Sequence, residues 1–253
     1  MSCCPKTSWK NVTALSSTPL ELRGENQSIG EWNTPVYYTQ CTSPSKRAII
    51  FFPDVYGVSD RLKSIADSFA NHGYHSIVVD CFHGETADKN SNGDVLGWIG
   101  KFPWSLVSRD LHASGDFLQG KGVEKNSIAA IGFCWGGWAI AKSSAEGFCW
   151  KCAVSPHPST KIEHFVFGDD ESAMLGKVNM PFLLMPAGDD GDNVKPGSED
   201  VKTLESKGGG SVVFDRMKHG FVTRGDLNET DVKEDTEKAL ALILDFIDKN
   251  FAK

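Results

Sequence analysis

The sequence predicts an α/β fold, with a mostly parallel central sheet and helices on both of its faces. Two observations support this prediction. Short runs of β-branched and aromatic residues alternate with longer amphipathic stretches along the chain, and no internal repeat or low-complexity tract interrupts them. We expect one domain over residues 25–253, preceded by a loosely ordered segment over residues 1–24.

The first predicted strand covers residues 48–52, which are continuously apolar and are followed by Pro53. An uninterrupted apolar run is typical of a strand that is buried on both faces. A helix should follow, because Ser59 is a suitable N-cap and Gly73 stands where a left-handed C-terminal cap is expected.

The later elements repeat this alternation. We predict further strands at residues 77–79, 127–133, 152–154, 182–185 and 212–214. We predict helices at residues 104–119 and 138–145, and a long C-terminal helix striped by Leu240, Ile243, Leu244, Ile247 and Phe251.

Composition excludes several classes of function. The chain has 253 residues, of which 26 are basic and 33 acidic, so its net charge is −7. An acidic surface repels nucleic acids and anionic membranes, and no apolar run approaches the roughly 20 residues of a membrane span. Residues 1–24 contain no apolar signal-peptide core, so we expect a cytoplasmic protein whose seven cysteines are mostly reduced.

The sharpest local pattern surrounds Cys134. An apolar strand runs through Gly132 into Phe133-Cys134-Trp135, and Gly136 and Gly137 then open a helix. This is a nucleophile elbow with cysteine in place of serine, where small residues two positions before and after the nucleophile permit a tight turn. The N-terminus of the following helix favours a thiolate and offers N–H groups to an oxyanion. The alternatives are a buried structural cysteine in a glycine-rich turn and a loop that binds phosphate.

A nucleophile of this kind needs a base, and in such sheets the order is nucleophile, acid, histidine. His219 follows the last predicted strand and precedes the final helix, which is the expected place of the base. His157 also follows a strand and is the second candidate, or a wall of the pocket. His164 is expected at the surface.

The acid should follow the strand at residues 182–185, where Asp189, Asp190 and Asp192 compete. Counting back four residues from Pro196 favours Asp192, whereas counting forward from Gly188 favours Asp190 or Gly191. We take Asp192 as the first choice and keep Asp189 and Asp190 as alternatives.

These motifs resemble the dienelactone hydrolase family, α/β-hydrolases that use cysteine where most relatives use serine. The resemblance covers roughly residues 25 to 252 and is carried by four short segments, which are Gly132 to Gly137, His219-Gly220-Phe221, the Asp192 loop and Pro53 to Gly57. The N-terminal Cys3-Cys4-Pro5 is similar to the eukaryotic branch.

The resemblance implies an α/β-hydrolase fold, a Cys134, Asp192, His219 triad and an oxyanion hole made by the backbone N–H groups of Trp135 and Val55. It implies hydrolysis of small esters or lactones through an acyl-thioester, with no cofactor and no metal. Asp54 falls where the family has a glutamate that contacts the nucleophile, and is one methylene shorter.

The predicted pocket departs from the bacterial pattern. Members that open dienelactone bind its carboxylate with arginines, but residues 80–85 contain none. After His219 the nearest guanidinium is that of Arg224, one residue later than in the family pattern. We expect Tyr56, Phe82 and Trp104 to line the mouth and to favour neutral substrates, with His83 and Arg224 leaving some tolerance for acids.

Two other functions compete with hydrolysis. Cys149 and Cys152 have the Cys-x-x-Cys spacing of thiol oxidoreductases, but they run into a strand and not into a helix N-terminus. A catalytically silent binding protein with the same fold is the other alternative.

Overall fold

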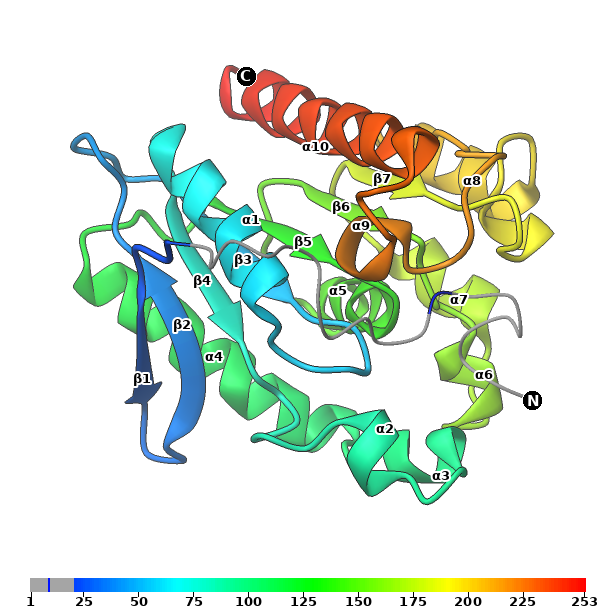
Figure 1. Ribbon diagram of the computed structural model, residues 1–253, viewed down its shortest axis with the longest axis horizontal. Coiled ribbons are helices and arrows are strands. Elements are labelled where there is room, and N and C mark those ends of the chain that lie inside the picture. The colour runs from blue at the N-terminus through cyan, green and yellow to red at the C-terminus, as the bar shows by residue number, and fades with distance from the viewer. Residues whose placement is uncertain (1–8, 10–20) are drawn as a thin grey trace.

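The structure is a computed structural model that describes Trp9 and residues 21–253. Its strands form one eight-stranded sheet in the order β1-β2-β4-β3-β5-β6-β7-β8 (Figure 1). Six neighbouring strands, β4, β3, β5, β6, β7 and β8, run parallel to one another, whereas β2 is antiparallel to both β1 and β4. The predicted α/β fold with a mostly parallel sheet is confirmed. The loosely ordered segment lies almost entirely outside the described residues and stays a prediction.

The bounds of the elements are as follows. The strands are β1 Glu25–Ile29, β2 Thr34–Thr39, β3 Ala48–Phe52, β4 His75–Val79, β5 Ile128–Gly132, β6 Ala153–Pro156, β7 Phe182–Met185 and β8 Gly210–Ser211. The helices are α1 Asp60–Asn71, α2 Ala87–Asn90, α3 Val95–Ile99, α4 Trp104–Gly120, α5 Trp135–Ala145, α6 Ile162–Phe165, α7 Glu171–Lys177, α8 Glu199–Glu205, α9 Phe221–Arg224 and α10 Thr230–Phe251, with a 3-10 turn η1 Asp192–Val194.

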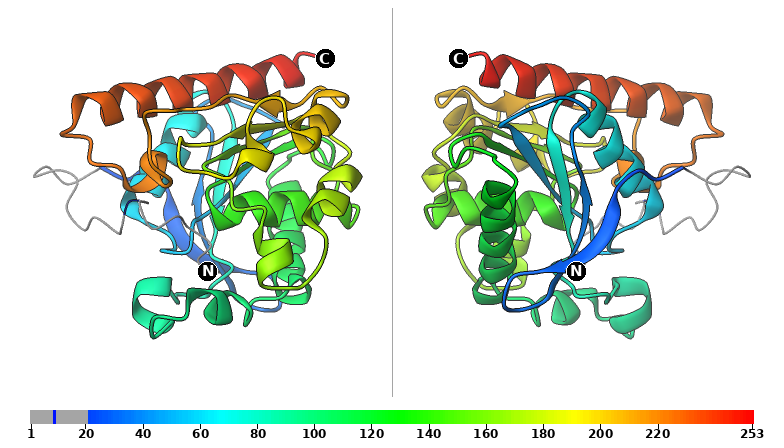
Figure 2. Two further views of the ribbon diagram at one scale, coloured as in Figure 1. Left: turned by 90° about the vertical axis from the view of Figure 1, so that its right-hand side faces the viewer. Right: turned by 90° about the vertical axis from the view of Figure 1, so that its left-hand side faces the viewer.

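The sheet separates two apolar cores because successive side chains of a strand point to opposite faces. In β3, Ile50 and Phe52 join the core that is covered by α4 and α5, while Ile49 and Phe51 join the core that is covered by α1 and α10. Figure 2 shows these helices on the two sides of the sheet. Both faces of the central strands are therefore removed from water, which explains their unbroken apolar runs.

The topology brings distant segments to one edge of the sheet. Strands β3, β5, β6, β7 and β8 are neighbours in that order and point the same way, so the loops after them meet at their common carboxyl edge. Asp54, Cys134, His157, Asp190 and His219 lie on these five loops. Ligands of open α/β sheets bind at such an edge, so the site is expected there.

Most predicted elements are confirmed. The strand at residues 48–52 has the predicted bounds, and the side chain of Ser59 accepts the N–H of Leu62 at the start of α1. Gly73 has a φ of 86°, as a left-handed cap requires. The prediction missed the β1–β2 hairpin, and the last strand is two residues earlier than expected, with Phe214 joined to the sheet by an isolated bridge to Ala187. No helix among the described residues combines the length and apolar character of a bilayer span.

Candidate active site

Cys134 stands at a strained turn between β5 and α5. Its φ is 54° and its ψ is −111°, and its side chain is fully buried. The flanking glycines are needed because a Cβ on Gly132 would overlap the carbonyl oxygen of Gly136, and one on Gly136 would lie 2.7 Å from the carbonyl oxygen of Phe52. The predicted elbow geometry is confirmed, except that α5 begins at Trp135, directly after the cysteine. A side chain is held in such a conformation only where the surrounding structure requires it.

His219 forms a buried ion pair with Asp190. Its Nδ1 lies 2.6 Å from Oδ1 of Asp190, and neither side chain is more than 2% exposed. A carboxylate on Nδ1 sets the tautomer and the orientation of the ring and leaves Nε2 available to a reacting group. The arrangement is that of an oriented base beside a thiol.

The expectation that Asp192 contacts His219 is wrong. The side chain of Asp192 is 99% exposed and pairs with Lys195 at 3.2 Å. The chain turns at the end of β7, because the N–H of Asp190 bonds to the carbonyl of Ala187 and Oδ2 of Asp190 accepts the N–H of Ala187. This tight turn directs Asp190 inward, while Asp192 begins the 3-10 turn η1 at the surface.

Asp189 and Asp190 hold different parts of His219. Oδ1 of Asp189 accepts the backbone N–H of His219 at 2.6 Å, while Asp190 binds the ring. The loop after β7 thus fixes both the main chain and the side chain of the histidine.

The pKa of His219 reflects its two partners. Burial lowers this pKa, but the charges of Asp190 and Cys134 and the hydrogen bond to Asp190 outweigh burial, so the pKa is raised above its ordinary value. The site therefore favours the protonated form of the His219 imidazole.

His157 lies against His219 without sharing its partner. The two rings meet edge to face with centroids 5.1 Å apart, and His157 is fully buried with a φ of 40°. Neither ring nitrogen of His157 has a hydrogen-bond partner among the described residues. Burial lowers its pKa well below the ordinary value, and the charges of His219 and Arg224 act in the same direction. The ring is a neutral wall of the site and no carboxylate orients it as a base.

Asp54 and Arg224 form a second buried ion pair. Nη1 of Arg224 lies 2.5 Å from Oδ2 of Asp54, which also accepts the hydroxyl of Thr223 at 2.7 Å. The other carboxylate oxygen accepts the N–H of Tyr56. None of the hydrogen bonds of Asp54 within the described residues goes to Cys134.

The guanidinium of Arg224 is enclosed by protein. Its Nε donates to the carbonyl of Trp9 at 2.9 Å, and its charge lies 4.6 Å from the centre of the Tyr56 ring. The side chain is only 3% exposed. Its charge is therefore compensated inside the protein.

Val55 and Trp135 lie on either side of the elbow. Val55 follows β3, whose Phe52 carbonyl accepts the N–H of Phe133, and Trp135 is the first residue of α5. Among the described residues, neither N–H donates a backbone–backbone hydrogen bond. Trp135 is the first residue of a helix, whose first N–H groups have no partner within it, and Val55 lies in the turn after β3, so both N–H groups are candidates for an oxyanion.

The aromatic residues expected at the mouth differ in exposure. Phe82 is fully buried and packs on Trp135 with ring centroids 4.5 Å apart. Tyr56 and Trp104 are half-buried against the same core. His83 is partly exposed and pairs with Asp110 of α4 at 3.1 Å. The ring of Tyr56 lies against the guanidinium of Arg224 and the ring of Phe82 lies against Trp135, so both contact residues of the site described above.

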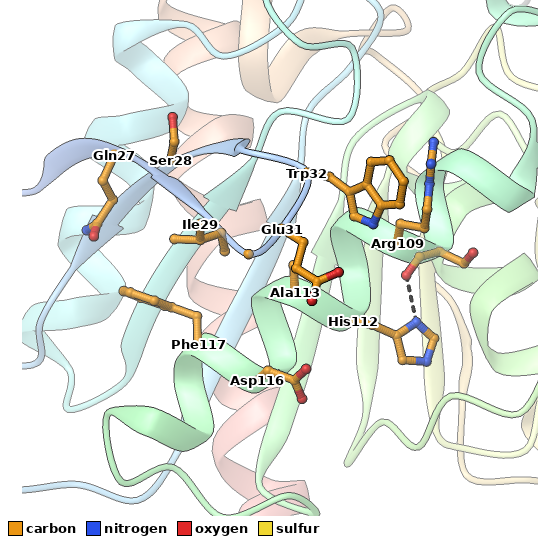
Figure 3. Close-up of a pocket in the computed structure, with 12 residues that line it drawn as sticks. Gln27, Ser28, Ile29, Glu31, Trp32, Arg109, His112, Ala113, Asp116 and Phe117 are labelled. Carbon is orange, nitrogen blue, oxygen red and sulfur yellow. Dashed lines mark hydrogen bonds between the residues drawn. The ribbon is translucent and has the colours of Figure 1, made fainter.

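A separate hollow lies between the β1–β2 hairpin and α4, with a volume of about 630 Å³. Trp32 and Arg109 form part of its wall (Figure 3). The guanidinium carbon of Arg109 lies 4.2 Å from the centre of the Trp32 ring. It is four strands from β5 in the sheet order, roughly 19 Å at the usual spacing, so it is distinct from the Cys134 site. No group of three or more possible metal ligands occurs in the described part of the chain.

The pair Cys149 and Cys152 lacks the features of a redox centre. Both are free thiols. Cys149 is exposed, whereas Cys152, the residue before β6, is buried. Burial raises the pKa of Cys152 to about 12, so this thiol stays protonated and is a poor nucleophile.

Two residues near the site were missed by the sequence analysis. The hydroxyl of Ser159 lies 3.5 Å from the sulfur of Cys134, and that of Thr223 donates to Asp54. Ser159 stands three residues after the end of β6, at an edge where small polar residues are common, whereas Thr223 lies in α9, well after the end of β8.

Comparison with known proteins decides the family. The model of the dienelactone hydrolase family matches residues 35–251. The chain belongs to the dienelactone hydrolase family. It is therefore a hydrolase of this family's type, and the predicted resemblance is confirmed.

The relatives of this family member are distant in sequence. It is 26% identical to a dienelactone hydrolase of Gibberella moniliformis over 192 residues, which cover 72% of this chain and 70% of that protein. It is also 26% identical to an AIM2 family protein of Schizosaccharomyces pombe, over 92% of each chain.

Solved structures support the α/β-hydrolase fold. A structure from Klebsiella pneumoniae described as a dienelactone hydrolase superposes with a TM-score of 0.68 at 19% identity, covering 86% of this chain and 96% of the other. A metagenomic dienelactone hydrolase-like phosphotriesterase gives 0.64 at 16% identity, covering 88% and 98%.

Proposed function

We propose that this hydrolase cleaves small carboxylic esters or lactones with Cys134 as nucleophile, His219 as base and Asp190 as the acid that orients it. The observation that carries the proposal is the buried 2.6 Å contact between Asp190 and His219, placed beside a cysteine at a strained elbow. An oriented imidazole next to a thiol is the arrangement that generates a thiolate nucleophile.

The reaction has two steps. The thiolate of Cys134 attacks the carbonyl carbon, the oxygen becomes an oxyanion, and His219 gives its proton to the leaving alkoxide. Water then attacks the thioester while His219 takes its proton, and the acid is released with return of the thiolate. Asp190 holds the ring and stabilises its charge in both steps.

The backbone N–H groups of Val55 and Trp135 stabilise the oxyanion in this proposal. Support comes from their places beside the elbow and at the first residue of α5, where the helix dipole adds to their effect. Loss of one such donor costs about 2.7 to 4 kcal/mol of barrier in comparable sites.

The proposed substrates are neutral around the scissile bond. A clamp for a substrate carboxylate needs an arginine whose charge is available, and the charge of Arg224 is already compensated by Asp54. Tyr56 and Trp104 present half-buried aromatic surface that suits an aryl or alkyl group.

The first test is a hydrolysis screen of aryl esters, thioesters and small lactones with wild type and Cys134→Ala. We expect the variant to lose turnover while its thermal midpoint stays within a few degrees, because a strained active-site residue contributes little stability. Mass spectrometry of quenched wild type should find the acyl group on Cys134. Retained turnover in Cys134→Ala overturns the assignment.

The second test compares an ester that bears a free carboxylate with its methyl ester. We expect a higher kcat/KM for the methyl ester. The control is the double variant Asp54→Asn, Arg224→Met, which removes both charges of the pair and should leave this preference in place. A preference for the free acid that the double variant abolishes would show that Arg224 binds substrate.

A further inference from the structure

The side chain of Ser159, on the loop after β6, touches the sulfur of Cys134. Oγ of Ser159 lies 3.5 Å from Sγ of Cys134, within hydrogen-bonding range for sulfur, and Ser159 is fully buried. Its hydroxyl therefore meets the sulfur in a space that is removed from bulk water. Resting on the proposed role of Cys134, we propose that Ser159 is a positioning residue that donates a hydrogen bond to the Cys134 thiolate and stabilises it.

The backbone holds Ser159 at this place. The N–H of Ser159 donates to the carbonyl of Cys134 at 2.9 Å, and the N–H of Cys134 donates to the carbonyl of Pro156 at 3.4 Å. The end of β6 and the loop after it are thus hydrogen-bonded to both the N–H and the carbonyl of Cys134. Pro158 packs closely against Gly137 of α5, because a Cβ added to Gly137 would lie 3.2 Å from Cβ of Pro158. This close packing also holds the loop after β6 in place.

The direction of the hydrogen bond follows from the charge state of the sulfur. A thiol can donate or accept, but a thiolate has no proton, so the hydroxyl must be the donor. A hydrogen bond to the charged form favours that form and lowers the pKa of the acid. Because the raised pKa of His219 keeps a proton on the imidazole, the sulfur beside it is the group that gives up its own.

The role differs from that of the base. His219 moves a proton, whereas Ser159 holds the sulfur and shares its charge before attack. When the sulfur bonds to carbon, its charge passes to the carbonyl oxygen and the hydrogen bond from Ser159 weakens. Loss of the hydroxyl should therefore reduce the thiolate fraction at low pH, with little effect once the thiol is fully ionised.

Among the described residues, the titratable groups whose charges interact with the sulfur come from two loops. They are His219 before α9, which is backed by Asp190, and His157 after β6, which is near Arg224. Because all of them remain in a Ser159 variant, a shift of the thiol pKa in that variant reports on the hydroxyl.

The chain offers a matched control in Ser155. It is a buried serine in the same segment, but its hydroxyl donates to the carbonyl of Gly132 at 2.6 Å and not to the sulfur. Ser155→Ala removes a buried hydroxyl and a hydrogen bond close to the elbow, as Ser159→Ala does. A general loosening of the loop should affect both variants alike.

The experiment is a pH titration of thiolate ultraviolet absorbance, each protein measured against the same protein carrying Cys134→Ala so that only Cys134 contributes. We expect Ser159→Ala to raise the midpoint by about one pH unit, so that below it the thiolate fraction falls about tenfold. Ser155→Ala should leave the midpoint in place. An unchanged midpoint in Ser159→Ala, or an equal shift in Ser155→Ala, overturns the inference.

The pH profile of hydrolysis separates this inference from the proposed function. In Ser159→Ala the acidic limb of kcat/KM should move to higher pH by the same amount as the pKa of the Cys134 thiol. The plateau value of kcat/KM should change less than about threefold, since a less stabilised thiolate is also the better nucleophile. If Cys134→Ala still hydrolyses esters, the proposed function fails, yet the absorbance shift remains a valid test of the hydrogen bond.

Discussion

His157 and His219 are equally buried and lie against each other, yet their pKa values shift in opposite directions. Each follows a strand at the same edge of the sheet, and both were candidates for the base in the sequence. Burial opposes the charge on both rings. Of the two rings, only that of His219 has a carboxylate, Asp190, on its Nδ1 among the described residues. The comparison teaches that the carboxylate partner, and not burial or position, sets the direction in which the pKa of a buried histidine shifts.

The largest expected effect comes from removing that partner. Asp190→Asn should lower kcat on the order of 10⁴-fold, because an amide no longer stabilises the imidazolium and favours the wrong tautomer. The same change should move the alkaline limb of the pH profile toward lower pH, since the pKa of His219 loses its main upward contribution. Steady-state kinetics across pH measure both.

Asp192→Asn is the matched control for this variant. Its carboxylate is two residues away in the same loop but lies in solvent, so its neutralisation should change kcat less than about twofold, as for a surface ion pair. A severe loss in Asp192→Asn together with a mild one in Asp190→Asn would reverse our assignment of the acid.

A smaller loss of activity is expected when only the hydrogen bond from Asp189 to the backbone N–H of His219 is weakened. Asp189→Asn keeps a side-chain oxygen but loses the charge that holds the His219 N–H at 2.6 Å. We expect up to about a 100-fold loss in kcat, the cost of a misplacement near 1 Å, with the alkaline limb unmoved. A shift of that limb equal to the one in Asp190→Asn would show that the two carboxylates do not have separate roles.

The smallest expected effect is on the pH dependence of folding stability, which follows from the direction in which each histidine pKa is shifted. The folded pKa of His157 is depressed, so its contribution is present above the unfolded value, near 6.5, and is lost as pH falls. The folded pKa of His219 is raised, so its contribution is present below about 6.5 and is lost as pH rises through the folded value.

His157→Asn tests this contrast, because asparagine tolerates the positive φ of the position. From about pH 7.5 to about pH 5.5 the wild type should lose about 1.4 kcal/mol more unfolding free energy than the variant, as expected for one proton bound only by the unfolded chain. Urea unfolding at both pH values measures the difference. Equal losses in the two proteins would mean that His157 is protonated in the folded state.

Local patterns in the sequence were sufficient for the frame of the site. The unbroken apolar runs predicted the buried strands, and the glycines around Cys134 predicted the elbow, because both depend on residues adjacent in the chain. The β1–β2 hairpin was missed because its strands are short, mixed in polarity and lie at one side of the sheet.

The tertiary structure alone decided which charges meet. Asp189, Asp190 and Asp192 are nearly equivalent in sequence, and only the turn that binds Asp190 to Ala187 directs one of them to His219. The pairing of Asp54 with Arg224 joins residues 170 positions apart. The sequence by itself determined which elements form and which thiol stands at the elbow, because steric fit and apolar burial act locally. Which polar groups become partners depends on how the loops of five separate strands converge, and that is a property of the folded chain.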